Sequence, residues 1–153
     1  FENDLFMEMR KLDVGQTIWI EDESHNIGYV KIPMPLYNQM RLKQVCFIDI
    51  PKEVRAQHLV KEYSIYGNEV LEYSINGIAK RMGSQNVKLA QDYLKQNNYY
   101  EVALLALQYY DKAYLKGVGK RDQNNVLKLP LSSMNHAENA KKIIQFIQTN
   151  VES

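Results

Sequence analysis

The feature that most constrains the fold is the segment QVCFIDIP at residues 44–51, an apolar run closed by a proline. Its β-branched and aromatic side chains are typical of a buried strand, which Pro51 ends because proline cannot donate to a strand ladder. The pattern then becomes helical up to about residue 116, before a second short apolar run, VLKLPL, at residues 126–131. Strands that are separated by helices favour a parallel sheet, because a parallel neighbour is reached through a helical crossover.

The remaining elements follow the same rules of periodicity and capping. We expect helices at 2–13 and 35–43, a buried strand at TIWIE (17–21), and a final helix capped by Asn135. Gly67, Gly83 and the pair Asn97–Asn98 are expected to divide the helical region into four helices. The predicted fold class is therefore α/β: a partial parallel sheet of strands 17–21, 45–50 and 126–130, with a helical insertion at about 52–116 grouped beyond one end.

Composition narrows the possible partners without identifying one. Nineteen basic and eighteen acidic residues give a net charge of +1, so any polyanion must bind through a local patch rather than through an overall field. No apolar run is long enough to cross a membrane, and nothing resembles a signal peptide. The single cysteine, Cys46, lies in the middle of the 44–51 segment, where we expect a buried apolar side chain rather than a nucleophile.

Several short stretches, in this order, resemble the bacterial tRNA 2-selenouridine synthase family: FEN (1–3), IWIEDESHNIG (18–28), IPMPLYNQM (32–40), IPKEVRAQHLVKEY (50–63), AKRMGSQ (79–85) and YYDKAY (109–114). The resemblance extends over nearly the whole chain. It implies an amino-terminal rhodanese domain with a catalytic cysteine, followed by a P-loop domain. No G-x-x-x-x-G-K-[ST] occurs in this sequence. Residues 1–153 are therefore expected to be a single partial P-loop domain that lacks the phosphate loop and the rhodanese domain.

The resemblance also implies an activity, that of a transferase acting on tRNA. The full-length enzyme would geranylate 2-thiouridine at the wobble position and replace its sulfur with selenium, using geranyl diphosphate and selenophosphate as co-substrates. We expect it to be cytoplasmic, with tRNA as partner and no membrane, and the fragment alone to be inactive, with no cofactor or metal. Two alternatives remain: the lid and core of a P-loop small-molecule kinase, or an RNA-binding module without catalytic activity.

The acidic segment after the 17–21 strand is the first candidate site. In P-loop proteins a terminal acid of a strand lies near the metal and the phosphates, and the resemblance therefore implies catalytic roles for Glu21, Glu23 and Ser24. The alternative is a solvated acidic loop. His25 is a predicted phosphate ligand, but the family pattern has an arginine there, and a histidine is only partly charged near neutrality.

Basic residues in the helical region form the second candidate site, for phosphate. Arg55 follows Pro51 by four residues, so its helix would carry it over the carboxyl edge of the sheet. His58 and Glu62 share its helical face, and a solvent-facing row of ion pairs is the alternative. Lys80 and Arg81 precede Gly83 and resemble the lid cations of P-loop kinases, although an exposed basic pair is often only solvated.

The segment LLALQYYDKAYLKGVGKR (104–121) interleaves aromatic with basic residues, a pattern that suits RNA. Tyr110 and Tyr114 share the helical face of Ala103 and Leu107, and we expect them to pack in the core or at a hinge. The predicted RNA-binding residues lie elsewhere on this helix and in the loop after it: Tyr109, Lys112, Lys116, Lys120 and Arg121. Packing remains the alternative for this segment.

Overall fold

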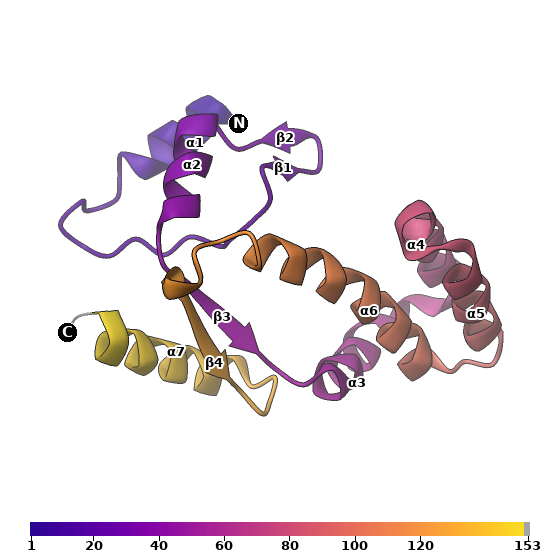
Figure 1. The fold of residues 1–153 in the computed structure, drawn as a ribbon. Helices are drawn as coiled ribbons and strands as arrows, with labels where there is room; N and C mark the ends of the chain where they lie inside the picture. The colour runs from indigo at the N-terminus through magenta and orange to yellow at the C-terminus, as the bar shows by residue number, and fades with distance from the viewer. Residues whose placement is uncertain (152–153) are drawn as a thin grey trace. The chain divides into compact units, whose positions relative to one another are not determined.

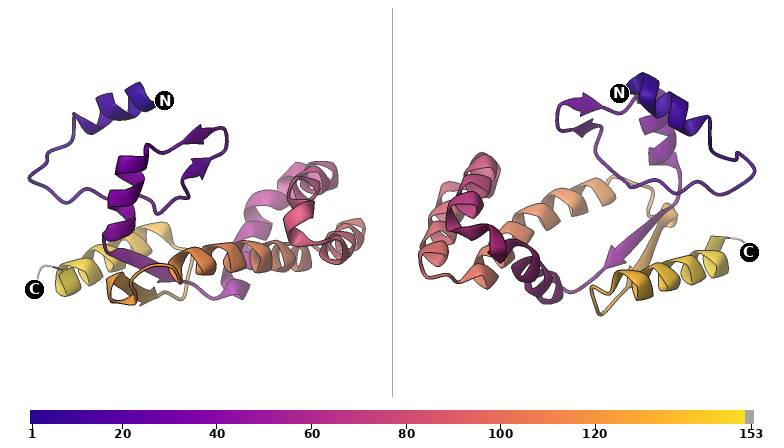
Figure 2. Two further views of the ribbon diagram at one scale, coloured as in Figure 1. Left: turned by 45° about the horizontal axis from the view of Figure 1, so that its top comes forward. Right: turned by 180° about the vertical axis from the view of Figure 1, so that it is seen from behind.

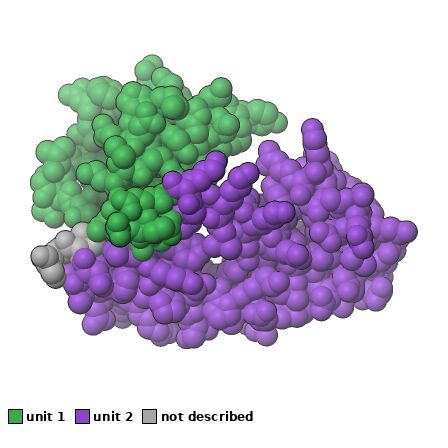
Figure 3. All heavy atoms as spheres, in the orientation of Figure 1, with its two compact units in different colours: residues 1–45, 121–126 green, residues 46–120, 127–153 purple. Residues whose placement is uncertain are grey.

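The structure, a computed structural model, describes residues 1–151, and its elements are shown in Figure 1. It divides into two compact units (Figure 3). The first consists of residues 1–45 and 121–126, and the second of residues 46–120 and the chain from 127 onward. The two units are described separately below.

The first unit contains two helices and a hairpin. Helix α1 spans Glu2–Met9, and α2 spans Met34–Leu42 with Pro35 in its first turn, where a missing N–H has no cost. Strands β1 (Asn26–Ile27) and β2 (Val30–Lys31) pair antiparallel, and a 3₁₀ turn, η2, spans Gln123–Asn125. Gly28 opens the hairpin turn with a φ of 58°, which a glycine adopts without strain.

The predicted strand at 17–21 is wrong. Residues 17–20 have no regular secondary structure, and Ile18, Trp19 and Ile20 are 41%, 57% and 52% exposed. A strand is stabilised by its ladder and by burial of its side chains, and within residues 1–151 no neighbouring strand supplies either. The apolar run identified a segment suited to a sheet, but an apolar run cannot provide the partner.

The second unit combines a small sheet with a group of helices. Strands β3 (Val45–Asp49) and β4 (Val126–Pro130) form a two-stranded parallel sheet, which confirms the predicted pairing of 45–50 with 126–130. The helical elements of this unit are α3 (Lys52–Tyr63), the 3₁₀ turn η1 (Ser64–Tyr66), α4 (Gly67–Met82), α5 (Ser84–Lys95), α6 (Tyr99–Val118) and α7 (His136–Val151). Helices α4 and α5 lie beyond the carboxyl end of β3, as expected (Figure 1).

The predicted breaks at Gly67, Gly83 and Asn98 and the predicted cap at Asn135 are confirmed by the backbone, whereas the helix predicted at 2–13 already ends at Met9. Gly67 and Gly83 have φ values of 77° and 89°, a region that side-chain-bearing residues rarely adopt. Asn98 caps α6 by accepting a hydrogen bond from the backbone N–H of Glu101, and Asn135 caps α7 through the N–H of Glu138. Sequence patterns that rest on local backbone chemistry therefore predicted the ends of these helices.

Three apolar clusters hold the second unit together. One joins α4, α5 and α6, which lie side by side in both views of Figure 2, through Ile75, Met82, Ala90, Leu94 and Val102. Another places Ala56 of α3 against Ala103 and Leu107 of α6. The last joins the sheet to α7 through Ile50, Leu129, Leu131, Ile143 and Phe146. Close packing of these small and medium side chains fixes the positions of the polar groups described next.

Candidate functional site

The predicted catalytic segment of the first unit is a turn that leads into the hairpin. The backbone N–H of Glu23 donates to the carbonyl of Glu21 at 2.8 Å, and the Ser24 hydroxyl donates to the carbonyl of Asn26 at 2.6 Å. Glu21 and Ser24 are exposed, and Glu23 is half-buried. The His25 ring lies 5.3 Å from the ring of Tyr37. The structure thus brings Glu21, Glu23, Ser24 and His25 into one short turn, with the Ser24 hydroxyl already engaged by the backbone.

The carboxylate of this segment that pairs with arginines is Asp22, which the sequence analysis did not select. The Arg121 guanidinium pairs with both oxygens of Asp22, with Nε at 3.2 Å from Oδ2, and Arg41 approaches the same carboxylate at 3.5 Å. Arg121 Nη1 also donates to the carbonyls of Met40, Arg41 and Lys43 at 3.1–3.3 Å, which satisfies the carboxyl end of α2.

Arg121 is therefore not available to RNA. Its side chain is 3% exposed, and its donors are committed to Asp22 and to backbone carbonyls. A phosphate would have to displace a buried pair, which is costly. We correct the RNA-binding prediction for Arg121 to a structural role. No sequence signal could have linked two residues 99 positions apart.

Arg55, in the second unit, is also held by the protein itself. Its Nη1 and Nη2 lie 2.6 and 2.9 Å from the two carboxylate oxygens of Asp111, and its Nε donates to the carbonyl of Ile50 at 3.0 Å. The hydrogen bond to Asp111 raises the pKa of Arg55 further above its usual range. The pair joins α3 to α6 and leaves two of the five guanidinium N–H groups for a ligand. Asp111 lies within the YYDKAY stretch but was not predicted to pair with Arg55.

The face of α3 that carries Arg55, His58 and Glu62 is only partly directed to solvent, since Arg55 and His58 are 28% and 23% exposed. His58 Nε2 lies 3.1 Å from a carboxylate oxygen of Glu62, one turn further along the helix. The His58 ring also contacts His136 edge-on, with 5.5 Å between the ring centroids. These contacts make His58 a link between α3 and α7.

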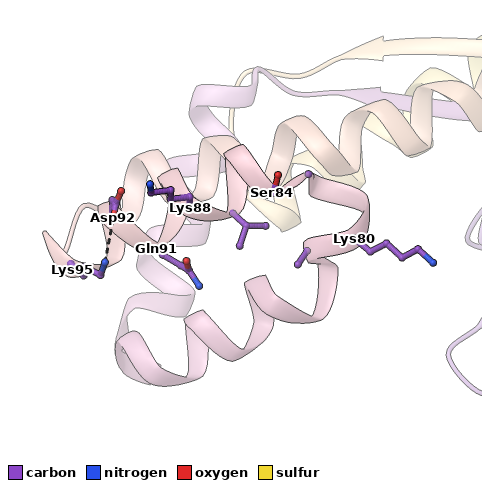
Figure 4. Close-up of a pocket in the computed structure, with 9 residues that line it drawn as sticks. Lys80, Ser84, Lys88, Gln91, Asp92 and Lys95 are labelled. Carbon is purple, nitrogen blue, oxygen red and sulfur yellow. Dashed lines mark hydrogen bonds and ion pairs between the residues drawn. The ribbon is translucent and has the colours of Figure 1, made fainter.

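Lys80 and Arg81 lie at the carboxyl end of α4, where cations complement the helix dipole. Arg81 donates to the hydroxyl of Tyr109 at 3.4 Å, and this contact raises the pKa of Arg81 further. Lys80 borders a groove of about 680 Å³ between α4 and α5 (Figure 4). The other lining residues are Ala79, Gly83, Ser84, Val87, Lys88, Gln91, Asp92 and Lys95. The sequence analysis singled out Lys80 but missed Lys88 and Lys95.

The predicted RNA-binding side chains of α6 share one face. Tyr109, Lys112 and Lys116 are spaced i, i+3 and i+7; both lysines are exposed, as is Lys120. Tyr109 is half-buried against the α4–α5–α6 cluster and lies 4.9 Å from the ring of Tyr110. The helix thus presents two lysines to solvent beside a tyrosine that is anchored by packing.

The predicted core packing of Tyr110 and Tyr114 is wrong, since these side chains are 45% and 55% exposed. The clusters that bury α6 involve its residues only up to Tyr109. The apolar face of α6 continues beyond Tyr109, but the helices that cover the first half of α6 do not cover this later part. Periodicity identified the face correctly, but it cannot report where the covering helices end.

Two further kinds of site are absent from residues 1–151. No group of three His, Cys, Asp or Glu side chains there is arranged to hold a metal ion. No helix in that range is both long and apolar enough to cross a membrane.

The fold and the polar groups define an α/β protein with a helical region that carries anchored arginines and exposed lysines. Residues 1–151 match the family model described as the tRNA 2-selenouridine synthase AAA domain. The chain belongs to the tRNA 2-selenouridine synthase family.

Two curated relatives agree with this assignment. A tRNA 2-selenouridine synthase from Serratia proteamaculans is 28% identical over 99% of this chain and 48% of its own length. One from Shewanella woodyi is 28% identical over 84% of this chain and 43% of its own length. The chain therefore spans about half the length of these relatives or less. No solved structure matches it.

Proposed function

We propose that this chain is part of an enzyme that geranylates 2-thiouridine at the wobble position of tRNA and then replaces the sulfur with selenium. The observation that carries the proposal is the family match over residues 1–151, supported by relatives named tRNA 2-selenouridine synthase. The co-substrates are geranyl diphosphate and selenophosphate. We place the reaction in the cytoplasm.

The chemistry requires groups that stabilise a diphosphate as it leaves. In the first step the sulfur of 2-thiouridine attacks C1 of the geranyl group, a C–S bond forms, and the C–O bond to diphosphate breaks. Cations that approach the leaving oxygens lower this barrier. We propose His25, Arg55, Lys80 and Arg81 as phosphate ligands.

Two further sets of residues are proposed to take part, one in catalysis and one in binding tRNA. Glu21, Glu23 and Ser24 are the proposed catalytic groups. Tyr109, Lys112, Lys116 and Lys120 are proposed to contact tRNA, and their exposure or anchoring on and beside one helix face supports this role. A phosphate at Arg55 would use the two N–H groups that Asp111 and Ile50 leave open.

Nucleoside analysis tests the activity. The complete reading frame that encodes this chain is expressed in a bacterial strain whose own tRNA 2-selenouridine synthase gene is deleted, and digested tRNA is analysed by mass spectrometry. We expect 2-selenouridine, and geranylated 2-thiouridine when selenium is withheld. The 153-residue chain alone is expected to give neither, because it contains no phosphate loop to position the diphosphate. If tRNA from the strain that expresses the complete reading frame contained only unmodified 2-thiouridine, the proposal would be wrong.

Arg55 separates diphosphate use from tRNA binding. In the complete protein Arg55→Ala should weaken geranyl diphosphate use by about 2 kcal/mol, the scale of a lost charge-assisted hydrogen bond. It should leave tRNA affinity nearly intact, because a tRNA surface spreads its charge over many residues. Asp111→Asn is the control, because it loosens the same ion pair but keeps the cation. Loss of tRNA affinity with normal geranylation would show that Arg55 faces RNA.

A further inference from the structure

The groove between α4 and α5 is lined with cations along its length. Three of its nine lining residues are lysines and one is an aspartate, which gives the lining a net charge of +2 (3 Lys − 1 Asp). Figure 4 shows Lys80 at one end of the groove and Lys95 at the other, with Lys88 on α5 between them. The distribution of charge favours an anionic ligand.

Two of these lysines have no acidic partner in the part of the chain that the structure describes. Only Lys95 forms an ion pair, at 3.1 Å from Asp92. Lys80 and Lys88 are exposed and form none. Beside the groove, the amide of Gln91 donates to the Glu72 carboxylate at 3.2 Å and to Asn76 at 3.3 Å, so Glu72 contributes a negative charge on the α4 side. The ammonium groups of Lys80 and Lys88 are therefore available to a ligand.

The spacing of the lysines selects an extended ligand. Lys88 and Lys95 are seven residues apart on α5, which corresponds to about 10 Å along the helix axis. One phosphate group can engage both lysines only if their side chains bend toward each other, whereas a nucleic-acid backbone presents phosphates at successive positions and can engage both side chains in extended conformations. The groove therefore fits a polyanion better than it fits the diphosphate of a small substrate.

An exposed aromatic side chain lies on the face of α4 that carries Lys80. Tyr73 of α4 is 82% exposed, and it precedes Asn76 and Lys80 by three and seven residues, so the three share one helix face. Asn76 faces the groove, because it receives a hydrogen bond from Gln91. An exposed tyrosine beside a row of cations is the combination that binds single-stranded RNA, with bases on the ring and phosphates on the lysines.

We propose that the α4–α5 groove binds the RNA backbone of the substrate tRNA through Lys88 and Lys95, while Tyr73 stacks on an unpaired base. This inference rests on the proposed function, because it takes tRNA as the substrate. It adds Lys88, Lys95 and Tyr73 to the residues proposed to contact tRNA. The α4–α5 pair is then a tRNA-binding arm of the second unit.

Salt-dependent binding to the 153-residue chain tests the groove. The dissociation constant for a tRNA transcript is measured at several salt concentrations for wild type, for Lys88→Ala/Lys95→Ala and for Tyr73→Ala. Each lost phosphate contact should lower the slope of log K against log salt by roughly 0.7–0.9. Tyr73→Ala should weaken binding about tenfold with an unchanged slope, the scale of one base–aromatic stack. Lys88→Arg/Lys95→Arg should keep both the affinity and the slope.

The controls remove matched side chains elsewhere. Lys141→Ala removes an exposed lysine of α7, and Tyr29→Ala removes the fully exposed tyrosine of the β1–β2 hairpin. Both should bind tRNA like wild type, and circular dichroism should show that every variant is folded. Inorganic diphosphate, compared with sodium chloride of equal ionic strength, should compete no better than the chloride.

Three outcomes would overturn the assignment: unchanged slope and affinity in the groove variants, equal losses in the controls, or specific competition by diphosphate. Each can occur while 2-selenouridine is still formed, so failure of the groove is distinguishable from failure of the proposed function. If the wild-type chain showed no measurable affinity for tRNA, the assignment of the groove as a tRNA-binding site would also be wrong, whatever the nucleoside analysis shows.

Discussion

The two units of this chain are held together in different ways. Of the twelve buried apolar residues in residues 1–151, only Ile32 belongs to the first unit, and the other eleven belong to the second. The first unit instead has a buried cation, Arg121, that joins Asp22 to the end of α2. It also leaves Trp19, Val14 and Leu42 among its exposed apolar side chains.

This difference shows what each kind of stabilisation requires. The apolar clusters of the second unit consist of many contacts without directional requirements, so removing one contact leaves the others in place. A unit organised by one buried guanidinium depends on a few directional bonds, because each unmet partner is costly. The first unit should therefore be sensitive to single polar changes, and the second to cavities.

The largest effect is expected for Arg121→Ala. The substitution leaves Asp22 and three backbone carbonyls without their donor, and loss of one partner of a buried pair costs about 3–5 kcal/mol. Hydrogen exchange followed by mass spectrometry should show faster exchange in residues 22–45, with little change in residues 84–118. Lys120→Ala, at the exposed neighbouring position, is the control. Equal protection in Arg121→Ala and wild type would show that the pair does not organise this unit.

A cavity in the second unit should have the next largest effect. Leu94 is 3% exposed and belongs to the cluster that joins α4, α5 and α6. Leu94→Ala should lower the free energy of unfolding by about 3 kcal/mol, which chemical denaturation measures. Leu89→Ala, at an exposed position on the same helix, should cost well under 1 kcal/mol. If Leu94→Ala instead accelerated hydrogen exchange in residues 22–45 before it did so in the second unit, the stabilities of the two units would be coupled.

The same contrast explains how much could be predicted from the sequence. In the second unit, apolar periodicity and the breaks at Gly67, Gly83 and Asn98 predicted the helices, because local propensity and packing agree there. In the first unit the apolar segment 17–21 was predicted to be a strand, and no partner strand in residues 1–151 supports it. Short apolar runs identify what a segment could form and do not reveal whether a neighbour exists.

The residues of the candidate sites also differ in how well the sequence could predict their surroundings. Lys80, Lys112 and Lys116 are exposed, as isolated lysines on a helix usually are, and their predicted roles as phosphate or RNA ligands stay predictions. Arg121 and Arg55 were also predicted to face ligands, but their partners Asp22 and Asp111 lie 99 and 56 residues away. A pairing of that kind depends on tertiary structure, and spacing within one helix contains no information about it.

A smaller effect is expected for the pair of Arg55 and Asp111. Its side chains are 28% and 31% exposed, so solvent screening reduces the contribution of a bidentate pair to about 1 kcal/mol. A double-mutant cycle with Arg55→Ala and Asp111→Ala measures this coupling energy by chemical denaturation. The exposed pair of Glu138 and Lys142, at i and i+4 on α7, provides the comparison and should couple more weakly because solvent screens it fully. Equal coupling in both pairs would mean that burial adds nothing to the link between α3 and α6.

The smallest effect on stability concerns Cys46, which is half-buried in β3 beside the sheet–α7 cluster. Burial raises the pKa of the Cys46 thiol, so at neutral pH the folded protein contains less thiolate than the unfolded chain. A thiol reagent should therefore label the native protein slowly and the unfolded protein rapidly. The folded state binds the thiol proton of Cys46 more tightly than the unfolded chain does. The contribution to stability is therefore fully present below the pKa of the unfolded chain and decreases as pH rises through the pKa of the folded protein. Cys46→Ala should flatten that alkaline decrease, and labelling in native buffer as fast as in denaturant would show that β3 is not covered at Cys46.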